Sequence, residues 1–188
     1  MPASVIVRVA VFLATSAAVI RLSWRSLKAP RSHGFYRFFA FELLIALVLV
    51  NAPVWFHDPL SARQLVSWTL AVSSIGFAAE GFRLLRVHGR PSPASSGAAE
   101  LDFENTSTLV TVGVYGFIRH PMYASLLACV WCAQLKDPFT VASVVLAMSS
   151  SGFLVATSVA EERENLVRFG QDYAAYMERT KRFVPFVF

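Results

Sequence analysis

Charged residues are scarce in this chain. Asp, Glu, Lys and Arg make up 15% of its 188 residues, whereas 55% are hydrophobic. A soluble domain carries about 25% charged residues, so the composition excludes an ordinary soluble globular protein. Apolar runs of about 20 residues recur, and a helix of that length crosses a hydrocarbon core of roughly 30 Å. The sequence therefore predicts an all-α integral membrane protein.

Cysteine is also scarce. Cys129 and Cys132 are the two cysteines, and they lie three residues apart in an apolar run. Neither a second CxxC pair nor a nearby histidine is present to complete a tetrahedral metal site. We therefore expect no metal, and we expect both thiols to pack as small hydrophobic side chains.

Acidic residues are absent from residues 21–37, where five basic residues occur. The formal charge of +5 and the pI near 9.6 do not indicate a nucleic-acid partner, because the basic residues lie between apolar runs. By the positive-inside rule, residues 21–37, residues 83–119 and the C-terminus face the cytoplasm. No internal repeat is apparent, so an inverted-repeat transporter is not favoured.

The apolar runs predict about five transmembrane helices. They lie at about residues 3–22, 35–56, 64–85, 120–135 and 138–160. The first is interpreted as a membrane helix and not as a signal peptide, because its hydrophobic part is long. The fourth is short for a full span, so local thinning or tilt would absorb the mismatch.

The rest of the chain is polar or amphipathic. We expect residues 161–180 to form a cytosolic C-terminal amphipathic helix, and the apolar ending after residue 180 to dock on the protein or on the interface. Residues 1–188 then form one membrane domain, with three N-terminal helices in 1–86, a cytosolic connector at 87–119, and a hairpin plus C-terminal helix at 120–188.

Two acidic residues near the membrane have basic neighbours. Glu42 lies within the second apolar run, where Arg37 or Arg31 is expected to pair with it. Glu80 precedes Arg83 by three residues, a spacing that suits a salt bridge on one face of a helix. Structural pairing is the favoured interpretation of both carboxylates.

The segment GVYGFIRHPMYAS, residues 113–125, marks the border between the polar connector and the fourth apolar run. Arg119 and His120 lie at that border, with Tyr115 and Tyr123 on either side. These residues are suited to a charged ligand, although membrane anchoring alone is the alternative interpretation. A hairpin of the last two apolar runs brings this border to the segment EERENLVRFGQDYAAY, residues 161–176.

Together the two segments provide donors for a carboxylate, Glu oxygens for hydroxyl groups, and acidic and aromatic groups for a positive centre. The pattern STLVTVGVYGFIRHPMY followed by EERENLVRFGQDYAAY resembles the integral membrane methyltransferases of the isoprenylcysteine carboxyl methyltransferase and phospholipid methyltransferase superfamily. The resemblance implies that the C-terminal half binds S-adenosylmethionine from the cytosol, while a lipophilic acceptor enters from the membrane.

The resemblance also implies the cofactor contacts. They fall on Glu100, Ser107, Thr108, Leu109, Val110, Tyr115, His120, Pro121, Met122, Tyr123 and Glu161. Glu162 completes the acidic pair and, with Arg119, is a candidate catalytic residue. If the nucleophile must lose a proton, Glu162, His120 or a tyrosine is the candidate acceptor, and a carboxylate nucleophile needs none.

One position departs from the pattern. Members that methylate prenylcysteine carboxylates carry an Arg four residues before the first of these glutamates, and this chain has Thr157 there. A carboxylate acceptor would lose a charge-assisted contact worth roughly 1.5 to 3 kcal/mol, unless Arg119 or Arg163 replaces it. A lipid amine, a prenyl-type carboxylate and a small hydrophobic nucleophile all remain candidate acceptors.

Two other functions are compatible with parts of the pattern. A membrane reductase of the sterol reductase type has a similar RHP motif and uses NADPH, but that family has about ten spans. A non-enzymatic lipid-binding protein explains the apolar helices and leaves the two polar segments unexplained.

Overall fold

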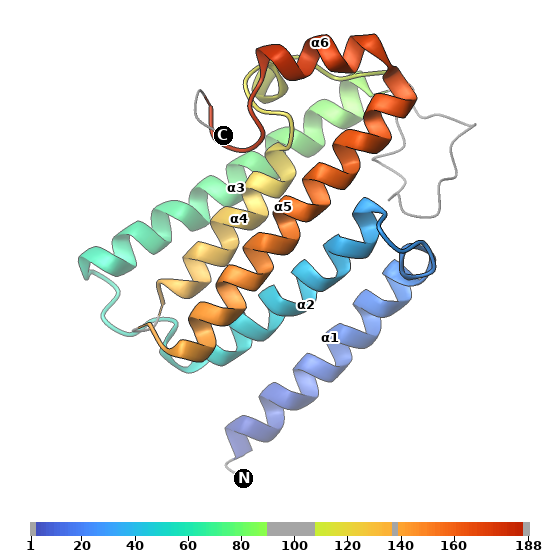
Figure 1. Cartoon of the computed structure of the whole chain (residues 1–188). Coiled ribbons are helices and arrows are strands. Elements are labelled where there is room, and N and C mark those ends of the chain that lie inside the picture. The colour runs from blue at the N-terminus through green and yellow to red at the C-terminus, as the bar shows by residue number, and fades with distance from the viewer. Residues whose placement is uncertain (1–2, 90–107, 137–138, 186–188) are drawn as a thin grey trace.

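Helices form the regular secondary structure of the described part of the chain. The computed structural model describes residues 3–89, 108–136 and 139–185. Its helices are α1 (Ala3–Leu27), α2 (His33–Asn51), η1 (Ala52–Val54), α3 (Ala62–His88), η2 (Gly113–Gly116), α4 (Pro121–Gln134), α5 (Val141–Phe169) and α6 (Gln171–Arg179). The prediction of an all-α membrane protein is confirmed (Figure 1).

Side-chain caps define where three of the long helices begin. Ser32, Ser61 and Thr140 each precede a helix with an extended backbone, and each side chain accepts a hydrogen bond from the backbone N–H three residues later. Such a cap satisfies one of the N–H groups that the first turn leaves without a partner. These caps define the residues at which α2, α3 and α5 begin.

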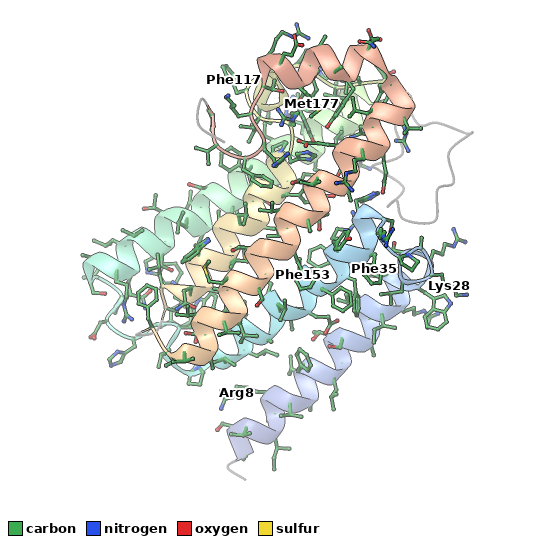
Figure 2. The ribbon with its side chains drawn as sticks, viewed as in Figure 1. Arg8, Lys28, Phe35, Phe117, Phe153 and Met177 are labelled. Atoms are coloured by element: carbon green, nitrogen blue, oxygen red, sulfur yellow. The ribbon has the colours of Figure 1, made fainter. Side chains whose placement is uncertain are left out.

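The bundle consists of two closely packed pairs with α1 at one edge. α2 packs on α5, and α3 packs on α4, while α1 contacts α2 and α6 lies across one end of the bundle (Figure 1). The rings of Phe39 and Phe153 stack at 5.2 Å between α2 and α5. Figure 2 shows Phe35 and Phe153 at this boundary. Leu47 and Leu154 are completely buried nearby.

The number of spans differs from the prediction of about five. Among the described residues, four helices are long and apolar enough to cross a membrane: α1, α2 with η1, α3 and α5. α4 has 14 residues, which corresponds to about 21 Å at a rise of 1.5 Å per residue and is short of the hydrocarbon thickness. The fourth apolar run therefore packs beside α3 and α5 without meeting the length of a full span.

Glu42 and Glu80, the two acidic residues expected to pair with basic neighbours, have different kinds of partner. Glu80 accepts hydrogen bonds from Arg83 at 2.7 and 2.8 Å, which confirms the predicted pair. Glu42 instead accepts a hydrogen bond from Ser16 on α1, a partner that the sequence did not indicate. Arg8, labelled in Figure 2, also connects these helices by donating to the Leu49 carbonyl at 3.4 Å.

The end of the bundle where α4 finishes contains a buried lysine. Lys136 is fully buried, donates to Gln64 at 3.1 Å, and lies over the rings of Trp55 and Trp68. Burial lowers the pKa of this ammonium group, and the aromatic faces offset part of that cost. This cluster ties the residue after α4 to α3 and to Trp55, which follows α2 and η1.

Candidate active site

The site begins where η2 leads into α4. Gly113 has φ of 61°, and a Cβ built there would lie 2.7 Å from a methyl group of Leu84. Glycine is therefore required by both backbone conformation and space. His120 precedes α4, and Pro121 occupies its first turn, where the missing N–H costs nothing. The segment from Gly113 to Pro121 therefore packs against the end of α3 at one end and leads into α4 at the other.

The segment that follows α6 hydrogen-bonds to the backbone just before α4. The backbone N–H of Arg119 donates to the Lys181 carbonyl at 2.7 Å, and that of His120 donates to the Arg182 carbonyl at 3.1 Å. Phe183 follows, 5% exposed, and packs in the main hydrophobic core. The prediction that the apolar ending docks on the protein is confirmed for the residues described, which extend to residue 185.

Glu162 lies at the centre of a buried ion cluster. Its carboxylate accepts hydrogen bonds from Arg119 at 2.9 Å and from Arg182 at 2.7 and 3.2 Å, and it lies 3.4 Å from His120 Nε2. The residue is 4% exposed. Both carboxylate oxygens are engaged, so this cluster joins α5 to the start of α4 and to the C-terminal segment.

Arg119 makes further contacts at the end of α6. One of its terminal nitrogens donates to the Met177 carbonyl at 3.2 Å and also to the Thr180 carbonyl. Backbone carbonyls at the end of a helix lack intrahelical donors, so the guanidinium completes the C-terminal turn of α6. α6 is consequently held against the site.

Two buried tyrosines of α6 lie next to these contacts of Arg119. Tyr176 donates from its hydroxyl to the Tyr115 carbonyl at 2.7 Å, which binds α6 to η2. Tyr173 lies beside it, with ring centroids 5.8 Å apart. Burial raises the pKa of both phenols well above the ordinary value, so each remains a neutral hydrogen-bonding group.

A cavity lies between these elements. About 660 Å³ of space between the atoms belongs to it, a volume that includes open solvent at its mouth. Its walls are formed by Leu85, Leu109, Val110, Tyr115, Arg119, His120, Pro121, Met122, Tyr123, Glu161, Asn165, Arg168, Phe169, Tyr173 and Tyr176. The ring of His120 stacks on that of Tyr123 at 5.5 Å, and its Nδ1 lies 3.9 Å from Glu161.

Most of the residues predicted from the sequence meet at this cavity. Nine of them line it: Leu109, Val110, Tyr115, Arg119, His120, Pro121, Met122, Tyr123 and Glu161. Thr108 is exposed and is not among the lining residues, and Glu162 lies behind the wall in the ion cluster. Glu100 and Ser107 lie outside the described residues.

The sequence reasoning missed several lining residues. Asn165, Arg168 and Phe169 follow Glu161 by four, seven and eight positions, which places them on the same face of α5. The spacing of these residues in the segment 161–176 could have indicated that they share the helix face of Glu161. The hydrogen bond from Arg182 to Glu162 could not be predicted from nearby residues, because the two residues are 20 positions apart.

Thr157 is not among the residues that line the cavity. It is fully buried, and its hydroxyl donates to the Phe153 carbonyl of its own helix at 2.7 Å. The hydroxyl of Thr157 is therefore occupied by a bond within α5.

The segment that forms this cavity matches a protein family. The family model for phospholipid methyltransferases matches residues 64–171, more than half of the chain. The chain belongs to the phospholipid methyltransferase family. No curated protein and no solved structure matched the chain in the corresponding comparisons.

Membership of the phospholipid methyltransferase family indicates a membrane methyltransferase. The matched segment begins in α3, contains the whole of α4 and α5, and ends at the first residue of α6. It therefore includes most of the cavity wall. Arg182, which binds Glu162, comes from outside the matched segment.

Proposed function

We propose that this protein is an S-adenosylmethionine-dependent methyltransferase that acts on a lipophilic acceptor. The observation that carries the proposal is one cavity lined by both polar segments, with His120 and Tyr123 on one side and Glu161 on the other. The basic segments that flank the apolar helices orient this cavity toward the cytoplasm.

The residues of the cavity fit the proposed cofactor. Glu161, whose side chain is 28% exposed, offers carboxylate oxygens to hydroxyl groups or to a positive centre. The rings of Tyr115 and Tyr123 offer aromatic faces of the kind that attract a sulfonium. Leu109 and Val110 add apolar surface for a flat base. When bound, the cofactor supplies an activated methyl group.

The role of the protein in such a reaction is chiefly alignment and exclusion of water, because transfer from a sulfonium is an in-line displacement. Arg119 lines the cavity, but its guanidinium is bound to Glu162 and to carbonyls of α6. We propose that Glu162 and Arg119 position the cavity walls. A proton-accepting role for Glu162 is disfavoured, since both of its oxygens accept hydrogen bonds from arginines.

The acceptor is proposed to be a lipid amine or another lipophilic nucleophile that reaches the cavity from the membrane. A carboxylate acceptor is less well supported, because Thr157 is buried and bonded to its own helix. Mass spectrometry of membrane extracts supplied with a deuterated methyl donor identifies the acceptor directly.

Isothermal titration of the purified protein tests the function. We expect it to bind S-adenosylmethionine and not NADPH, whereas a reductase would bind NADPH and a lipid-binding protein neither. His120→Ala and Glu161→Ala should each abolish binding while helical circular dichroism is retained. Glu178→Ala, on the exposed face of α6, is the matched control. Wild-type affinity in both cavity variants would contradict the proposed site.

A further inference from the structure

Four basic residues gather where α1 ends and the chain turns into α2. Arg21, Arg25 and Lys28 lie at spacings of four and seven residues, hence on one face of the last turns of α1 and of the turn that follows. Arg31 lies in the same turn, where its backbone adopts φ of 73°. Residues 21–37 contain no acidic residue, so no negative charge within this segment offsets the basic cluster of Arg21, Arg25, Lys28 and Arg31.

The side chains of the basic cluster are accessible. Arg21, Arg25 and Arg31 are exposed, and they form no side-chain hydrogen bond or ion pair within residues 3–89, 108–136 and 139–185. Lys28, labelled in Figure 2, is also exposed, and its ammonium group lies 5.1 Å from the centre of the Trp24 ring. Three guanidinium groups are therefore available to a ligand outside the protein.

Apolar side chains beside the basic cluster place it at the level of lipid headgroups. Leu22 and Trp24 are 75% and 57% exposed, and the apolar part of α1 is not buried within the bundle. That part of α1 faces acyl chains, and a tryptophan at the end of such a helix lies at the level of the headgroups. Lipid phosphates lie at the same depth, and a guanidinium can bind a phosphate with two parallel hydrogen bonds.

We propose that the basic cluster is a binding site for anionic phospholipids. Arg21, Arg25 and Arg31 contact the lipid phosphates, and Lys28 adds positive charge beside Trp24. Bound anionic lipid then holds the turn between α1 and α2 at the membrane surface. No residue of α1 or α2 lines the candidate active site, so this lipid site is independent of the proposed function.

Quenching of Trp24 fluorescence tests the site in the whole chain, reconstituted in phosphatidylcholine bilayers. A fraction of the lipid is replaced by phosphatidylglycerol or by phosphatidylcholine, each brominated near the glycerol end of its acyl chains. Trp24→Phe, measured in parallel, gives the signal of the other three tryptophans, so the difference reports the lipid beside Trp24.

The wild type should prefer phosphatidylglycerol at Trp24 by at least about fivefold, the effect expected of one basic residue near anionic lipid. Raising the salt concentration from about 0.1 M to about 1 M shortens the Debye length from about 10 Å to about 3 Å and should remove most of this preference. A preference that persists at the higher salt concentration would show that it does not arise from these charges.

A triple variant assigns the preference to the cluster. Arg21→Gln combined with Arg25→Gln and Arg31→Gln should reduce it to less than about twofold, because Lys28 alone remains. Lys28 is kept in this variant because its removal would itself change the fluorescence of Trp24.

A matched control removes the same number of charges from exposed positions on α3, α5 and α6: Arg86→Gln, Arg163→Gln and Arg179→Gln. This control should keep the preference of the wild type, because its cations lie outside the cluster. Loss of the preference in both triple variants would overturn the proposal, since overall charge would then be the cause.

Equal quenching by the two lipids in the wild type, or an unchanged preference in the cluster variant, would also overturn the proposal. If the cluster variant loses its helical circular dichroism, the three single replacements decide instead. Each should lower the preference, and wild-type behaviour in all three would show that these arginines do not bind the lipid.

Discussion

Replacement of Glu162 by Gln should destabilise the protein more than any exposed substitution. The carboxylate compensates Arg119 and Arg182 at 2.9 and 2.7 Å, and it is almost completely buried. Removing one partner of a buried ion pair costs about 3 to 5 kcal/mol, because the remaining charge stays buried and uncompensated. The side chain of Arg182 is 20% exposed, which favours the lower end of that range.

The expected cost can be read as a change in thermal unfolding. For a chain of this size, 1 kcal/mol lowers the midpoint by about 2 to 4 °C, so a loss of about 3 kcal/mol corresponds to about 6 to 12 °C. A thiol-reactive fluorophore suits the measurement, since Cys129 and Cys132 are free thiols within α4, with Cys132 buried. Glu178→Gln is the control, because it makes the same chemical change at an exposed site.

A second variant tests the cause of the destabilisation. If the loss arises from uncompensated arginine charge, Glu162→Gln combined with Arg182→Gln should cost less than the sum of the single changes. An unfolding midpoint of Glu162→Gln within about 2 °C of wild type would refute the role of Glu162 as the partner of Arg119 and Arg182, because leaving a buried arginine without its partner should cost more than that. Strict additivity in the double variant would show that the two side chains are not coupled.

Two further predictions concern the positions around the site. Gly113→Ala should lower both the unfolding midpoint and the affinity for S-adenosylmethionine, because alanine must adopt φ of 61° and its Cβ would lie 2.7 Å from Leu84. If titration gives the wild-type affinity for that variant, η2 does not shape the cavity. Cys129→Ser with Cys132→Ser should leave turnover nearly intact, since neither thiol lines the cavity; complete loss of methyl transfer would contradict their packing role.

The features that the sequence determined are those encoded by nearby residues. Apolar runs of sufficient length specify helices whatever their neighbours, so the all-α membrane architecture followed directly. The Glu80 to Arg83 pair and the caps of α2, α3 and α5 likewise depend on residues three apart. The two polar segments were recognisable for the same reason, because each is continuous in the chain.

Tertiary structure alone decided how these parts meet. Glu162 binds Arg119 across 43 residues, and His33 at the start of α2 binds Glu164 of α5 across 131. Contacts between residues so distant in sequence depend on how helices pack, and the periodicity of one segment carries no information about the partner. The packing of the short helix α4, the buried setting of Glu162 and the exposure of Arg168 to the cavity were decided in this way, since side-chain environment is a property of the assembled bundle.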